Sequence, residues 1–132
     1  MAKVLILGGS GMIGAGLAQS LQAAGISVEI TSRSGESIHR MPEVAVHKFE
    51  ALADSPADVL SELNSGDYVI NCIGLVKQLA EADDPLAALP INAMLPHRLS
   101  ALCALVGARL VHISTDCVFA GTRGGYTEAD AP

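Results

Sequence analysis

Residues 8–14, with the sequence GGSGMIG, constrain the fold of this chain more than any other segment. The preceding run from Val4 to Leu7 is short and wholly apolar, which is typical of a strand buried on both faces. After the glycines, apolar residues recur every three or four positions as far as Ala24, which predicts an amphipathic helix that ends at Gly25. A strand, a glycine-rich turn and a helix in this order are typical of a site that holds a phosphate against the backbone.

The glycine spacing G-x-x-G-x-x-G assigns a separate task to each glycine. Gly8 takes the chain out of the strand, Gly11 lets a pyrophosphate approach the backbone, and Gly14 lets the helix pack closely. The alternative is an ordinary tight strand–helix turn, but the flanking pattern favours dinucleotide binding. The helix dipole lies behind the backbone N–H groups that we expect to point at the phosphate, which belong to Ser10, Gly11, Met12 and Ile13.

The rest of the chain alternates between strand-like and helix-like patterns. Apolar or alternating runs predict further strands over residues 27–32, 44–49, 68–73 and 109–114. Helical spacing predicts a short helix after Pro56 and a long one from Asp83 to Val106, which Pro90 and Pro96 should bend or interrupt. We therefore predict one α/β domain over residues 1–132, a doubly wound (Rossmann) parallel sheet with the strand order 3-2-1-4-5.

Composition supports this fold and excludes several classes of protein. Half of the residues are hydrophobic, only 3% are aromatic, and the net charge is −6. A chain this apolar should fold, and its acidic balance leaves no broad surface for nucleic acid or anionic lipid. Polar residues interrupt every apolar stretch before a membrane span of about 20 residues, so we expect no membrane segment. Three cysteines without a C-x-x-C pair, and four scattered histidines, predict no disulfide framework and no metal site, in keeping with the cytoplasm.

The end of the second strand should decide which nicotinamide cofactor binds, because this position lies beside the adenosine ribose. An acidic residue there would bind the ribose hydroxyls and repel a 2′-phosphate. The chain instead has Ser32 and Arg33, a hydroxyl and a guanidinium that both suit a phosphate. The pattern therefore favours NADP(H) over NAD(H), the alternative being that Arg33 is an ordinary surface charge.

Four segments together carry a family resemblance that covers the whole chain. These are residues 8–14, residues 69–74 with the sequence VINCIG, residues 91–93 with INA, and residues 112–121 with HISTDCVFAG, which GYTE follows at 125–128. With them the chain resembles the extended short-chain dehydrogenases/reductases, and within these the dTDP-4-dehydrorhamnose reductase-like branch that modifies sugar nucleotides.

The resemblance implies roles for particular residues. Asn92 would steady the backbone of the active site, and the Thr115 hydroxyl would bind the substrate carbonyl, unless Thr115 only caps its own backbone. Lys77 is a candidate for a phosphate of the nucleotide sugar, and Asp116 belongs to the same substrate segment as Thr115. Further positions match residues of the family that contact the cofactor. They are Asn71, Cys72, Ile73 and Gly74 and, as a looser match, Glu50 and Ala51.

The catalytic pair of this family is a tyrosine followed four positions later by a lysine. Cys72 stands four positions after Tyr68 and Asp130 four positions after Tyr126, so neither tyrosine qualifies. We therefore expect the chain to be the N-terminal, cofactor-binding portion of a longer enzyme, inactive alone and without the last strands and the substrate domain.

The function we predict is that of an NADP(H)-dependent reductase acting on a keto group of a nucleotide-activated sugar. A sugar-nucleotide epimerase or dehydratase is an alternative, because the first half of the fold is shared. A non-catalytic dinucleotide-binding protein, sensing or assembling, is another. If the chain ends naturally at Pro132, the apolar edge formed by residues 109–114 should pair between copies and give a homo-oligomer.

Overall fold

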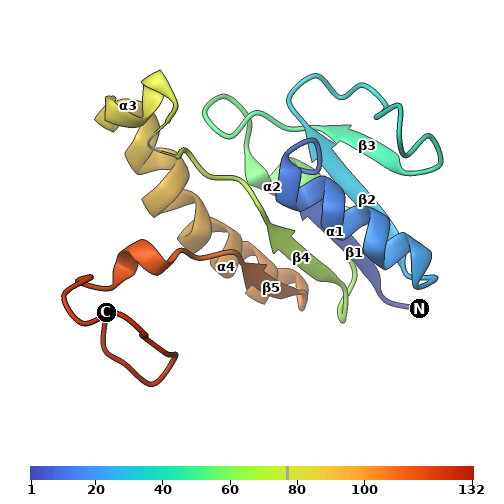
Figure 1. Ribbon diagram of the computed structural model, residues 1–132. Helices are drawn as coiled ribbons and strands as arrows, with labels where there is room; N and C mark the ends of the chain where they lie inside the picture. The colour runs from blue at the N-terminus through green and yellow to red at the C-terminus, as the bar shows by residue number, and fades with distance from the viewer. Residues whose placement is uncertain (77) are drawn as a thin grey trace.

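The structure, a computed structural model, describes residues 1–76 and 78–132 (Figure 1). Its centre is a five-stranded parallel sheet with the order β3-β2-β1-β4-β5, which confirms the predicted fold and topology. Three strands are shorter than the sequence predicts: β3 lacks one predicted residue at each end, and β4 and β5 each end two residues early. The strands are β1 (Lys3–Leu7), β2 (Ser27–Ser32), β3 (Ala45–Lys48), β4 (Tyr68–Asn71) and β5 (Arg109–His112).

Helices cover both faces of the sheet (Figure 1). Successive residues of β1 point to opposite faces, so Val4 and Ile6 pack with α1 (Met12–Ala23) while Leu5 and Leu7 pack with the helices of the other side. That second layer contains α2 (Pro56–Leu60) and α4 (Leu95–Val106), whose buried residues Leu60, Leu95, Leu99 and Cys103 share one cluster with Val69 of β4.

The long helical segment is interrupted, as its prolines predict. It consists of α3 (Pro85–Ala88), a π-helical stretch η2 (Leu89–Met94) and then α4, and it ends at Gly107 with a φ of +76°. A short 3₁₀ turn, η1 (Ala80–Asp83), precedes it. Because Pro90 has no N–H and its ring crowds the preceding turn, the regular α-helical bonding is lost where the proline falls.

Taken as one segment, Pro85–Val106 is long and apolar enough to cross a membrane, contrary to the reading of its sequence. Length and composition alone do not distinguish such a span from a core helix of a globular domain. Here Leu99 is fully buried and Cys103 is 2% exposed, and both pack against the sheet. One face of the segment therefore packs on the sheet, while Leu86 and Leu105 on its other side are exposed.

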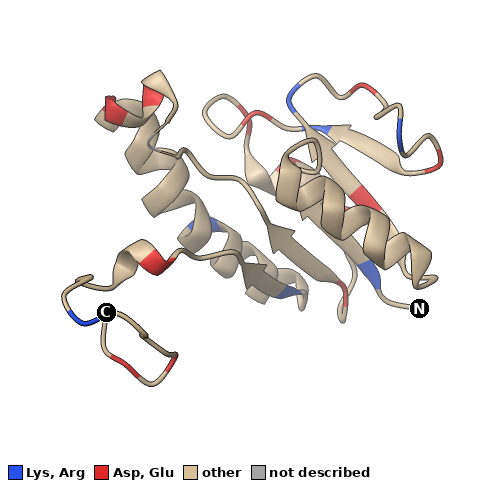
Figure 2. Ribbon diagram, viewed as in Figure 1, with Lys and Arg blue, Asp and Glu red and all other residues tan. Residues whose placement is uncertain are grey.

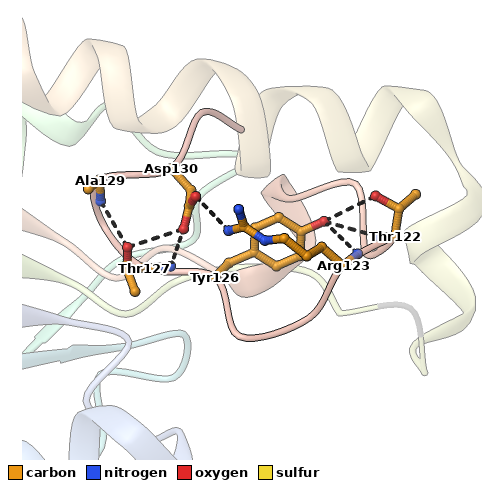
Figure 3. Close-up of polar contacts among 6 residues, drawn as sticks. All are labelled: Thr122, Arg123, Tyr126, Thr127, Ala129 and Asp130. Carbon is orange, nitrogen blue, oxygen red and sulfur yellow. Dashed lines mark hydrogen bonds and ion pairs between the residues drawn. The ribbon is translucent and has the colours of Figure 1, made fainter.

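The chain after β5 leaves the sheet and forms a separate loop that contains η3 (Asp116–Val118) (Figure 1). Tyr126 organises this loop: its hydroxyl oxygen accepts hydrogen bonds from the N–H groups of Thr122 and Arg123 at 3.1 and 3.2 Å (Figure 3). The Tyr126 ring stacks on Phe119 with centroids 4.8 Å apart, and Arg123 pairs with Asp130. The loop is therefore held by its own side chains.

Candidate functional site

Most of the residues that the sequence singles out gather at one edge of the sheet. All five strands are parallel, so their carboxyl ends face the same side, where Gly8 follows β1, Arg33 follows β2 and Cys72 follows β4. The strand order reverses direction between β1 and β4. In open α/β sheets, ligands bind outside the carboxyl ends of the strands at such a switch point.

The glycine turn needs its glycines for steric reasons that the structure makes explicit. Gly8 has a φ of +79°, a conformation that side chains disfavour. A Cβ on Gly14 would lie 2.3 Å from the carbonyl oxygen of Gly8, so the start of α1 packs directly on the turn. A Cβ on Gly9 would lie 2.4 Å from the Cβ of Ile30 in β2, a constraint that the sequence pattern did not assign. Gly11, by contrast, faces open space apart from the Gly8 oxygen at 3.4 Å.

The backbone N–H groups of the turn divide into those already bonded and those left over. The Gly11 N–H donates to the Gly8 carbonyl at 3.1 Å, so the expectation that it points at a ligand is wrong. The N–H groups of Ser10, Met12 and Ile13 have no acceptor among residues 1–76 and 78–132. No side chain caps α1 and no acidic residue lies in its first turn. These donors therefore lie at a positive helix end whose partial charge nothing in the first turn compensates.

Ser32 and Arg33 come directly after Thr31, which bonds to Gly8 and Gly9 of the turn. Ser32 is 6% exposed, and its Oγ accepts a hydrogen bond from the Gly35 N–H at 3.0 Å. Arg33 is exposed and has no ion-pair partner within the described part of the chain. Figure 2 shows basic residues along the connection from β2 to β3 and in β3 itself; by sequence these are Arg33 and Arg40 on the connection and Lys48 at the end of β3.

The exit of β4 contacts the glycine turn directly. A Cβ on Gly8 would lie 3.1 Å from the Ile73 side chain and 3.4 Å from the Cys72 carbonyl, so the two loops are neighbours. Burial raises the pKa of the half-buried Cys72 thiol, which therefore stays protonated at neutral pH. Asn71 is fully buried, with its amide on the His112 Nδ1 at 3.1 Å and its oxygen on the Ile73 N–H. Its side chain shapes this loop and is not free for a ligand.

Asn92 holds the next part of the same loop. Its side-chain oxygen accepts from the Leu75 N–H at 2.8 Å and its amide donates to the Leu75 carbonyl at 2.9 Å. Gly74 lies against this clamp, since a Cβ on Gly74 would be 3.6 Å from the Asn92 oxygen. Asn92 therefore lies where it can steady backbone at the carboxyl edge, and Lys77, two residues beyond Leu75, lies outside the described residues.

The remaining candidates lie farther along the edge. The Phe49 N–H donates to the Ser32 carbonyl at 2.9 Å, which brings Glu50 beside the exit of β2, while Ala51 packs against the core. Thr115 caps η3, because its hydroxyl oxygen accepts from the Cys117 N–H at 3.2 Å. Asp116 is exposed next to it. Among the described residues, no group of three or more His, Cys, Asp or Glu could hold a metal ion.

Comparisons with known proteins agree on one family. The family model described as the RmlD substrate binding domain matches residues 2–132. A dTDP-4-dehydrorhamnose reductase of Mycolicibacterium smegmatis is 35% identical over 130 residues, which are 98% of this chain and 34% of that protein. A protein of Rattus norvegicus named methionine adenosyltransferase 2 subunit beta is 27% identical over 98% of this chain and 37% of its own length.

Solved structures give the same picture of the fold. A hypothetical dTDP-4-dehydrorhamnose reductase from Sulfolobus tokodaii matches with a TM-score of 0.78 and 27% identity, over 98% of this chain and 45% of that one. MoeE5 in complex with UDP-glucose and NAD matches with a TM-score of 0.79 and 23% identity, over 99% of this chain and 42% of that one. The chain thus spans between a third and a half of the length of these relatives and structures.

Proposed function

The chain belongs to the RmlD substrate binding domain family, and from this membership we propose that it is the NADP(H)-binding portion of a reductase that acts on a keto group of a nucleotide-activated sugar. The observation that carries the proposal is the uncapped start of α1, where the N–H groups of Ser10, Met12 and Ile13 lack acceptors among the described residues. In this proposal residues 1–132 act as one cofactor-binding domain.

The cofactor pyrophosphate binds across the glycine turn. Three backbone N–H donors and the positive end of α1 supply the attraction, so no lysine is needed at this point. Gly11 has no side chain and therefore lets a phosphate oxygen come close to the backbone. A net charge of −6 is compatible with such a site because the positive potential is local.

The adenosine half lies over the exits of β2 and β3. We propose that Arg33 and the Ser32 hydroxyl bind the 2′-phosphate, since Ser32 accepts one hydrogen bond and keeps its own proton to donate. Glu50 and Ala51 lie beside the adenine in this proposal, because the hydrogen bond between the Phe49 N–H and the Ser32 carbonyl brings their segment next to this exit.

The nicotinamide half extends toward β4 and β5. Its neighbours in this proposal are the loop residues Cys72, Ile73 and Gly74. Hydrogen bonds from the Ile73 N–H to the buried Asn71 and between Leu75 and Asn92 hold the backbone of this loop in place. NAD(P)H supplies a hydride when bound. On the substrate side, the Thr115 hydroxyl donates a hydrogen bond to the carbonyl oxygen. Its oxygen accepts from the Cys117 N–H, and its hydrogen, which points to the Asp116 Oδ1 at 3.5 Å, turns to the substrate instead. Asp116 and Lys77 bind polar groups of the sugar nucleotide.

A titration of the purified chain with NADPH and with NADH tests the cofactor assignment. We expect NADPH to bind, and to bind more tightly than NADH. Gly11→Ala should weaken both cofactors while the fold persists, because its Cβ would make only an ordinary contact with the Gly8 oxygen and would project toward the phosphate. Arg33→Ala should weaken NADPH alone, and Arg98→Ala, an exposed arginine on α4, is the matched control. Binding of neither cofactor, or a preference for NADH, would contradict the proposal.

A second candidate function is that of a dinucleotide-binding subunit without turnover, and the relative named as a subunit of a methionine adenosyltransferase favours it. The two candidates share the cofactor site and differ in chemistry. An assay of the full-length protein with NADPH and a dTDP-4-keto sugar separates them: oxidation of NADPH supports the reductase, and its absence with cofactor binding intact supports the subunit. A 4-epimerase would interconvert sugar isomers with no net oxidation of the cofactor.

Two further parts of the proposal concern the cellular location of the protein and its self-association. The three cysteines are free thiols, in keeping with a cytoplasmic site. β5 is the last strand of the sheet among the described residues, with Val111 44% exposed and Ile113 37% exposed, and we propose that this chain, taken alone, pairs with copies of itself through this strand. Light scattering checks this, because a monomer at all concentrations would argue against pairing.

A further inference from the structure

The connection between β2 and β3 is more ordered than its polar sequence indicates. Met41 is 2% exposed and Val44 is 5% exposed, and both belong to the same apolar cluster as Ile30 of β2 and Ala18 of α1. The Met41 N–H donates to the Ile38 carbonyl at 2.8 Å, which closes a turn over residues 38–41. Burial of Met41 thus fixes the position of the exposed residue before it, Arg40.

Arg40 lines a cleft of about 380 Å³ that it shares with the glycine turn. The lining comprises Ser10, Gly11 and Met12 at the start of α1, further residues along that helix, and Ile38, Arg40 and Met41 of the connection. Arg40 is the one charged residue of the lining. It has no ion pair or side-chain hydrogen bond with any described residue. A guanidinium in this position is available to an anion that enters beside the turn.

We propose that Arg40 is a second residue that determines cofactor specificity, binding the 2′-phosphate of NADP(H) together with Arg33. This inference rests on the proposed function, because it needs a cofactor on the glycine turn. Arg33 and Arg40 lie on the same connection, Arg33 directly after β2 and Arg40 on the turn that Met41 anchors, and in this inference one phosphate at the exit of β2 binds both. A 2′-phosphate carries two negative charges near neutral pH and can accept from two guanidinium groups at once.

The alternative ligand for Arg40 is the pyrophosphate, which NADH and NADPH share. The two assignments predict different patterns of binding. A residue that contacts the 2′-phosphate affects NADPH alone, whereas a residue that contacts the pyrophosphate affects both cofactors equally.

Isothermal titration of the chain and of Arg40→Gln with NADPH, NADH and 2′-AMP tests the inference. We expect Arg40→Gln to weaken NADPH by about tenfold to a hundredfold, the range for one charged hydrogen bond, and to leave NADH unchanged. 2′-AMP should lose affinity in parallel. Arg98→Ala is the control for loss of one positive charge, and unfolding curves verify that each variant is folded.

Double substitution of Arg33 and Arg40 gives a further readout, because two residues on one phosphate should show non-additive losses. Equal weakening of NADH and NADPH by Arg40→Gln, or no change in either, would overturn the inference while leaving the proposed function intact. Failure of the unaltered chain to bind either cofactor would instead overturn the proposed function.

Discussion

The hydroxyl oxygen of Thr31 at the end of β2 accepts a hydrogen bond from the Gly8 N–H at 3.1 Å, and the Thr31 carbonyl accepts from the Gly9 N–H at 2.9 Å. One residue of β2 therefore holds both residues that lead from β1 into the glycine turn. Thr31 is 1% exposed, so water cannot replace its hydroxyl in this role. The phosphate-binding turn of the proposal is thereby attached to the strand that leads to Ser32 and Arg33.

Thr31→Val should destabilise the fold, because the isosteric side chain leaves the Gly8 N–H without its acceptor. The expected loss in the free energy of unfolding is about 1–3 kcal/mol, measured by urea denaturation. Thr31→Ser keeps the oxygen and should retain most of the stability. Equal losses for the two variants would show that the methyl group, and not the hydrogen bond, is responsible.

Gly14→Ala and Gly16→Ala should have opposite effects, although the two glycines are two residues apart on α1. A Cβ on Gly14 meets backbone atoms at 2.3 and 2.9 Å, which cannot move aside cheaply, so a loss of about 1–3 kcal/mol or more is expected. A Cβ on Gly16 meets nothing within 4 Å, and removing a flexible glycine from a helix should add about 0.5–1 kcal/mol. Thermal unfolding of both variants checks the pair.

Asp67 should make the stability depend on pH. Hydrogen bonds from the N–H groups of Lys3 and Asn64, each 2.8 Å, lower the pKa of this buried carboxyl. The unfolded state therefore binds the proton more readily, so this contribution is present at neutral pH and is lost as the pH falls from about 4 through the lower pKa of the folded state.

Asp67→Asn should therefore lower the free energy of unfolding at pH 7 and flatten its decrease with acid, as measured by urea denaturation at several pH values. Glu62→Gln removes an exposed carboxylate from the neighbouring turn and serves as the control. An unchanged acid dependence in Asp67→Asn would assign the effect to other carboxylates, of which Glu29 is the first to test, since its pKa is also lowered by hydrogen bonds to Lys3 and His47 in spite of desolvation.

Asn92→Leu should release the loop after β4, because it removes both hydrogen bonds to the Leu75 backbone. We expect faster hydrogen exchange at the Leu75 amide and a stability loss of about 1 kcal/mol, since Asn92 is exposed to water. Asn92→Asp keeps the acceptor and loses the donor, so the exchange rate of the Leu75 amide in this variant should lie between the rates in the unaltered chain and in Asn92→Leu. An unchanged Leu75 amide in Asn92→Leu would show that other contacts order this loop.

Some contacts at the carboxyl edge were open to prediction and others were not. Asn92 was expected to steady backbone there, and it bonds both groups of Leu75. Gly9 received no role because its constraint comes from Ile30, a residue 21 positions away that only the packed sheet brings near. The inward bond of the Gly11 N–H was likewise missed, because it depends on the φ of Gly8.

The sequence by itself determined the order of strands and helices, the topology of the sheet and the position of the glycine turn, because these follow from local periodicity and from residues with unusual backbone freedom. Only the tertiary structure decided which donors of the turn stay free, what Thr31 and Asn71 bond to, and that the polar segment around Arg40 is anchored by Met41 beside the turn. These are contacts between residues distant in the chain, and a hydrogen bond or a buried side chain acquires its partner only when the sheet and its helices have closed around it.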